Sequence, residues 1–191
     1  EGDSFVWEIT ELDVQRFERV FDIVPKFEEG YKTKILIKKM IDVSYGWSLT
    51  VERWNYIASR ESFSRNGSIE YMSIHSDPTE YNEELFIPTP VEDYLEEAAE
   101  TLPSEYLVDG KTVTRREQQD DFKLVKEYNG QGVCVSETYL DFDDNRVIIK
   151  VEGTFRAIPT GTWEPITFMM IAISGFIFFL MRRRKVLVKT V

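Results

Sequence analysis

An uncharged apolar segment near the end of the chain sets the first limit on how this sequence folds. Ile166 to Met181 (ITFMMIAISGFIFFLM) holds no charged residue in 16 positions. Four basic residues follow it at once: Arg182, Arg183, Arg184 and Lys185. The segment is apolar on every side, whereas a surface helix shows an apolar stripe. We therefore predict a single-pass transmembrane helix over 166–181, and not a buried core helix.

The basic cluster also predicts the orientation of the chain. Cationic side chains resist crossing the bilayer, so the tail over 182–191 should stay in the cytoplasm and the N-terminal region should be extracellular. A helix of this length extends about 24 Å, short of the roughly 30 Å hydrocarbon layer. Trp163 and the stems of Arg182 to Lys185 complete the fit at the interfaces. Residues 159–165 (PTGTWEP) form the predicted stalk. The predicted location is the cell membrane.

Charge is distributed unevenly between the two regions. Five of the 23 basic residues and none of the 34 acidic residues lie after position 165, so the first 165 residues carry a net charge of −16. Such a surface repels nucleic acid and anionic headgroups, so we expect no nucleic-acid partner. The chain begins at Glu1 without a methionine, which suggests that a leader segment has been removed.

Residues 1–158 are predicted to form an extracytoplasmic α+β domain that is mostly antiparallel β-sheet. Turn dipeptides such as Asn66-Gly67 and Asp109-Gly110 separate short runs in which apolar and polar residues alternate. That period indicates strands with one face toward a core and one toward water. Residues 147–151 (VIIKV) are apolar on both faces at several positions, so we place them centrally in the sheet.

One helix is predicted to cover this curved sheet. Thr89, Pro90 and Glu92 form an N-terminal capping box, and the apolar residues that follow have helical spacing up to Pro103. The opposite face of this helix is strongly acidic, which indicates a solvated surface. A second helix over Val14 to Val20 is ambiguous, because its apolar spacing fits neither period well.

Two polar motifs are candidates for binding sites. Asp141, Asp143 and Asp144 cluster carboxylate oxygens of the kind that calcium prefers, although a hairpin turn explains the same residues without an ion. Asn66 begins an Asn-Gly-Ser sequon for N-glycosylation, and the same Asn-Gly pair is also a tight-turn signal.

Residues for catalysis are few, so we predict a protein that is not an enzyme and needs no cofactor. His75 is the only histidine, and Cys134 lies far from it in sequence within a run typical of a buried strand. A single cysteine also excludes an internal disulfide. The acidic pairs Glu83-Glu84 and Asp120-Asp121 lie in polar stretches where burial is not expected.

Aromatic residues give the remaining signal. Trp47, Trp54, Tyr56 and Tyr71 fall in adjacent predicted strands, where they could line a concave surface that takes an apolar ligand or a partner chain. The alternative is an aromatic core between the sheet and the helix.

Several short motifs carry a resemblance to a known family. They are the processed start Glu1 to Glu8, the helix entry Phe86 to Leu95, the strand pair Tyr128 to Val133, and the anchor that ends in basic residues. Together they resemble archaeal exported surface proteins grouped by their C-terminal transmembrane anchor, the choice-of-anchor type. The resemblance implies an exported, anchored β-rich domain and brings no catalytic residues. A weaker likeness, by fold analogy alone, is to the curved sheets of bacterial lipoprotein carriers.

The sequence therefore predicts a non-enzymatic, membrane-anchored binding protein, a subunit or accessory of a cell-surface or membrane assembly. Its expected contacts are membrane lipid through the C-terminal helix, and a protein partner or a second copy of itself. The alternative is a carrier for a lipid or another apolar ligand in a half-open β-sheet.

Overall fold

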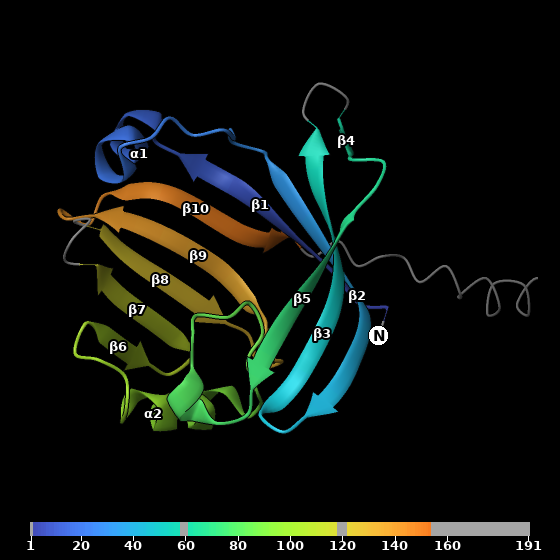
Figure 1. Cartoon of the computed structure of the whole chain (residues 1–191). Coiled ribbons are helices and arrows are strands. Elements are labelled where there is room, and N and C mark those ends of the chain that lie inside the picture. Colours follow the sequence, from blue (N-terminus) through green and yellow to red (C-terminus); the bar gives the residue numbers. More distant parts are fainter. Residues whose placement is uncertain (1, 58–60, 118–121, 154–191) are drawn as a thin grey trace, which may run out of the picture. The chain divides into compact units, whose positions relative to one another are not determined.

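The fold comes from a computed structural model that describes residues 2–57, 61–117 and 122–153 (Figure 1). All of these residues belong to one compact unit. Within these ranges no helix has both the length and the apolar character needed to cross a bilayer. The predicted stalk, transmembrane helix and tail lie outside the described residues.

The described residues form one ten-stranded antiparallel sheet, as the alternating pattern predicted. Its central order is β4-β3-β2-β1-β10-β9-β8-β7-β6, and β5 pairs with β3 beside β4. The strands are β1 (Ser4–Leu12), β2 (Lys32–Val43), β3 (Gly46–Ile57), β4 (Ser62–Phe63), β5 (Ser68–His75), β6 (Tyr106–Asp109), β7 (Thr112–Glu117), β8 (Phe122–Tyr128), β9 (Cys134–Asp141) and β10 (Arg146–Gly153). β10 lies between β1 and β9, so the central place predicted for residues 147–151 is confirmed.

The sheet is strongly curved (Figure 1). Trp7, Ile35 and Val51 are almost completely buried, and each lies on the inward phase of its strand, the alternate positions whose side chains face the core. Register shifts in β1 and β2 add local bends of the kind that β-bulges produce. One face of the sheet therefore encloses the core while the other meets solvent.

Two helices pack against this sheet, whereas the sequence predicted one clearly and left the other ambiguous. α1 (Val14–Phe21) follows β1, and the Asp13 carboxylate caps it by accepting a 3.0 Å hydrogen bond from the backbone N–H of Arg16. α2 (Val91–Ala99) is the expected helix with its acidic face exposed. Its predicted capping box is wrong: the N-cap is Pro90, which has no side chain to accept a hydrogen bond, and the peptide before it is cis. A short 3-10 helix, η2 (Pro78–Glu80), precedes α2.

The core has two parts, which lie on either side of an extended segment over 81–87. Beneath α2, one cluster joins Leu95 and Ala98 to Val113 on β7 and Cys134 on β9. The other cluster joins Trp7 on β1 to the buried faces of β2 and β3. Phe86 reaches into this second cluster, with its ring 5.1 Å from Phe5 and 6.2 Å from Trp7 between centroids. The segment thus fills much of the concave face with the chain's own side chains.

Candidate functional site: a cavity on the concave face

The concave face is not filled throughout, because a cavity of about 360 Å³ lies beneath α1. Its walls come from α1, the connection from α1 to β2, and strands β1, β2, β9 and β10. Most of the lining side chains are apolar or aromatic: Trp7, Ile9, Phe17, Phe21, Phe27, Tyr31, Tyr139 and Ile148. Thr33, Glu137 and Lys150 complete it. A volume of this size with few polar groups is typical of small-molecule sites.

A chain of aromatic contacts builds the outer wall of this cavity. The Phe17 ring lies 4.6 Å from Phe21 and 5.4 Å from Phe27 between centroids, and the Phe21 ring lies 5.8 Å from Tyr139 on β9. Edge-on and tilted contacts of this kind are favourable arrangements for aromatic pairs. The α1 turn and the loop after it are therefore held against the sheet by rings that also face the cavity.

Polar contacts fix α1 at the end of the sheet. The backbone N–H of Asp13 donates a 2.9 Å hydrogen bond to the carbonyl of Val147, and Arg16 Nε lies 3.4 Å from Asp141 Oδ2. The helix ends at Asp22, which takes a left-handed conformation with a φ of 53°. These contacts place Phe17 and Phe21 over the concave face.

A ladder of alternating charges crosses three neighbouring strands of the sheet, and two of its members, Glu137 and Lys150, line the floor of the cavity. Glu137 on β9 stands opposite both Lys150 on β10 and Lys126 on β8 in the sheet register. Its carboxylate oxygens lie 2.6 Å from Lys150 Nζ and 3.0 Å from Lys126 Nζ. Burial alone would raise the pKa of Glu137, but the two lysines hold it below its ordinary value. Glu137 is therefore ionised at neutral pH.

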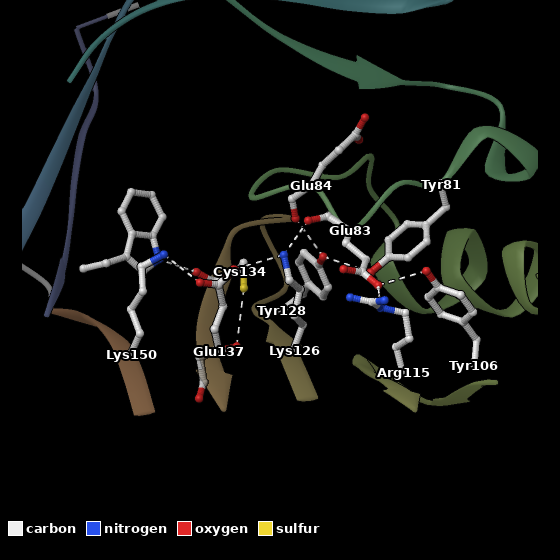
Figure 2. A network of polar contacts seen from close by, with 12 residues as sticks. Tyr81, Glu83, Glu84, Tyr106, Arg115, Lys126, Tyr128, Cys134, Glu137 and Lys150 are labelled. Atoms are coloured by element: carbon white, nitrogen blue, oxygen red, sulfur yellow. Dashed lines mark hydrogen bonds and ion pairs between the residues drawn. The ribbon is translucent and has the colours of Figure 1, made fainter. Parts of the chain in front are cut away.

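The segment over 81–87 is bound to the sheet beside this ladder, as Figure 2 shows. Tyr128 on β8 donates a 2.8 Å hydrogen bond to the carbonyl of Glu84, and Lys126 Nζ donates to the carbonyl of Glu83. The Glu83 carboxylate accepts from Tyr106 and pairs with Arg115. Backbone hydrogen bonds join Ile87 to Gly132 and Leu85 to Cys134. The network closes the concave face on the α2 side of the cavity.

Glu84 lies buried in the segment over 81–87, where the sequence predicted an exposed polar loop. Its side chain is 12% exposed, and Oε1 lies 3.7 Å from His75 Nε2. Burial raises the pKa of Glu84 to about 7, against the opposing effects of a hydrogen bond from the His75 backbone and the charge of Lys126. Oε2 of Glu84 and the hydroxyl of Tyr94 are buried without a hydrogen-bond partner among the described residues. The expectation of solvated carboxylates is wrong for this pair. Asp120 and Asp121 lie outside the described residues.

The four aromatic residues predicted to line a concave surface do not lie together. Trp47 shares the inward phase of β3 with Leu49 and Val51, whereas Trp54 and Tyr56 share the opposite phase. Tyr71 on β5 pairs with Thr50 and is 78% exposed, so it also faces outward. Lys34 Nζ lies 5.2 Å from the Trp54 ring centroid and Lys32 Nζ 5.9 Å from that of Tyr56. The aromatic residues of the cavity come instead from α1, from the loop that follows it, and from β1 and β9.

The acidic cluster proposed for calcium forms the hairpin between β9 and β10. Asp141 Oδ1 accepts hydrogen bonds from the backbone N–H groups of Asp143 and Asn145 at 3.0 and 2.8 Å, and Asp144 pairs with Lys123. Among the described residues no group of three or more histidine, cysteine, aspartate or glutamate side chains is arranged to hold a metal ion. The hairpin interpretation accounts for these contacts without an ion.

The remaining predicted sites are at the surface or outside the described residues. Asn66 is exposed in the turn between β4 and β5, where Ser64 Oγ donates to its backbone carbonyl. Cys134 is confirmed as a buried strand residue, and burial raises the pKa of its thiol to about 11. The proposed membrane contacts of Trp163, Arg182, Arg183, Arg184 and Lys185 lie outside the described residues.

Sequence reasoning missed the charged floor of the cavity, although a signal for it was present. In β8, Lys126 shares the period-two phase of Phe122, Leu124 and Tyr128, all of which are buried. A lysine on the apolar phase of a strand indicates a buried charge that needs a partner. The partner, Glu137, becomes apparent only with the register of β8 and β9.

No protein-family model, curated protein or solved structure matches this chain.

Proposed function

We propose that this chain is a non-enzymatic, extracytoplasmic protein that binds an apolar ligand, such as an acyl chain, beneath α1. The helix predicted over 166–181 would anchor it in the cell membrane with its C-terminus in the cytoplasm, as in the anchored surface proteins that it resembles. The observation that carries the proposal is the cavity of about 360 Å³ whose walls are largely aromatic. A concave apolar surface of this kind favours binding, because a ligand displaces water from it.

The contacts of the segment over 81–87 and of α1 favour a binding cavity over a fully packed core. Phe86 and the segment around it fill the concave face on one side, and the polar network with Lys126 and Tyr128 fixes that segment. On the other side, α1 covers the face through rings that leave space between them and the sheet. The cavity is therefore bounded by fixed elements of the fold, which lowers the cost of ordering on binding.

Native mass spectrometry of the purified full-length chain tests this proposal. We expect a population with additional mass that organic extraction removes. Thr33 lines the cavity, so Thr33→Trp should fill it and abolish the additional mass. Thr50 lies on the opposite phase, facing Tyr71, and Thr50→Trp is the matched control that should retain it. A chain without extractable ligand that also fails to take up added fatty acids or alcohols would contradict the proposal.

A second candidate function is binding to a protein partner or to a second copy within a surface assembly. It is favoured by β5, an outer strand that pairs with β3 alone among the described strands and exposes Ile69 and Tyr71 by 54% and 78%. An apolar outer strand is a site where another chain can add to a sheet. Mass measurement in mild detergent tests it, because a strictly monomeric chain without a co-purifying partner would count against it.

A further inference from the structure

Two lysines share one carboxylate on the floor of the cavity. Glu137 contacts Lys150 through Oε2 and Lys126 through Oε1, so this group holds one more positive than negative charge. Lys126 and Glu137 are 6% and 8% exposed, whereas the Lys150 side chain is 26% exposed, so this group is open to water or to a ligand mainly at Lys150. A buried charge without a full counter-charge is costly, and an anion placed beside it relieves that cost.

Lys150 is the basic member of this group that lines the cavity. Its Nζ lies 5.8 Å from the Trp7 ring centroid, and both residues line the cavity wall. Glu137 is its one hydrogen-bond partner among the described residues, whereas an ammonium group has three donors. Lys126 is engaged more fully, because it donates to the carbonyl of Glu83 as well as pairing with Glu137.

The neighbouring acids do not remove the surplus charge at Lys150. Glu83 pairs with Arg115, and Glu84 lies against His75 on the far side of the closing segment. The pKa of Glu84 is raised to about 7, so near neutral pH it is only partly ionised. Of the residues that line the cavity, Glu137 alone is acidic.

We propose that the cavity binds an amphiphile with an anionic head, a fatty acid, whose carboxylate pairs with Lys150 while its acyl chain lies among Phe17, Phe21 and Phe27. This inference rests on the proposed function, because it names the ligand class of the same cavity. The aromatic wall takes the apolar chain, and Lys150 supplies the charge-assisted hydrogen bonds that a carboxylate accepts.

Comparison of two ligands with the same chain length tests the inference separately from the proposed function. Dodecanoate and dodecanol are titrated calorimetrically into the full-length chain in phosphatidylcholine nanodiscs, with empty nanodiscs as background. We expect dodecanoate to bind at least about tenfold more tightly, the effect of one buried charge-assisted contact. Equal binding of the two ligands would overturn the inference and leave the proposed function intact. Binding of neither would contradict the proposed function itself.

Substitutions of the charged residues at the cavity floor test whether Lys150 causes the preference for dodecanoate. Lys150→Met should weaken dodecanoate binding at least about tenfold and leave dodecanol binding within about threefold. Lys34→Met, on the Trp54 side of the sheet, is the matched control and should change neither. If Lys150→Met fails to fold by circular dichroism, Lys150→Arg should keep the preference for dodecanoate, and Glu137→Gln should strengthen dodecanoate binding alone. A preference for dodecanoate that is unaffected by both Lys150→Met and Glu137→Gln would overturn the assignment.

Discussion

The indole Nε1 of Trp7 on β1 donates a 2.8 Å hydrogen bond to the backbone carbonyl of Cys134 on β9. β10 lies between these two strands, so the bond spans a neighbouring strand across the concave face. Trp7 is 1% exposed and lines the cavity as well. The Trp7 side chain therefore contacts the segment over 81–87 through Phe86, the central strands and the candidate site.

Trp7→Phe should destabilise the chain by about 2–4 kcal/mol, because it leaves the Cys134 carbonyl without its donor and opens space in a packed region. Urea unfolding measures the change. The matched control is Trp54→Phe, whose indole packs on the outer face near Lys34, with an expected cost below about 1 kcal/mol. Equal costs for the two variants would show that the Trp7 hydrogen bond adds nothing.

Gly132 should be intolerant of any side chain. A Cβ there would lie 2.0 Å from the carbonyl oxygen of Ile87, whose N–H bonds to Gly132. Gly110 is a matched control, because it also has a positive φ but a Cβ added there would meet nothing within 4 Å. We expect Gly110→Ala to cost about 1 kcal/mol and Gly132→Ala at least about 2 kcal/mol more. Similar unfolding midpoints in urea would contradict the close contact between the segment over 81–87 and the sheet.

Glu84 should make the chain less stable as pH rises from about 4.5 to about 7. Its folded-state pKa of about 7 exceeds the ordinary 4.5, so the folded state prefers the protonated form. The stability is complete below the unfolded pKa and is lost as pH rises through the folded pKa. Glu84→Gln should therefore match the native chain near pH 4.5 and exceed its stability by about 2–3 kcal/mol near pH 8.

Urea unfolding at a series of pH values measures this difference. The same comparison in a His75→Gln background isolates Glu84 from the neighbouring imidazole, whose Nε2 lies 3.7 Å from Glu84 Oε1. A difference between Glu84→Gln and its parent that does not vary with pH would contradict the burial of Glu84.

Asp141 should be important for stability without any metal. Its Oδ1 accepts from two backbone N–H groups of the hairpin, and Oδ2 lies near Arg16 on α1. Asp141→Ala should cost about 1–3 kcal/mol, whereas Asp143→Ala should cost less than about 0.5 kcal/mol. Calcium at millimolar concentration should leave the melting temperature unchanged. A rise in melting temperature that Asp143→Ala removes would support the alternative, a calcium site.

The strand pattern was predictable from local sequence, and the site was not. The alternating runs predicted strands with one buried face, and in the runs around Trp7, Leu49 and Leu124 those apolar residues are buried, because side-chain direction follows the two-residue period. The same period cannot tell which strands are neighbours. Trp54 and Tyr71 therefore looked like parts of one concave surface, although the register places them on the outer face.

The cavity depends on contacts between residues far apart in sequence. Phe17 and Phe21 had ambiguous spacing, and only the docking of α1 near Tyr139 shows what they cover. The burial of Glu84 follows from backbone pairing between the segment over 81–87 and the start of β9. Neither relationship has a local signal, since both depend on contacts between segments that are far apart in the chain.

Photo-cross-linking with a diazirine-labelled fatty acid tests the central claim most directly, because it locates the bound ligand on the full-length chain. Peptides from α1 and the loop before β2, which contain Phe17, Phe21 and Phe27, should carry the label. Thr33→Trp should remove this labelling, and Thr50→Trp should not. Labelling confined to the outer face around Trp54 and Tyr71, or unchanged labelling in Thr33→Trp, would contradict a ligand-binding cavity beneath α1.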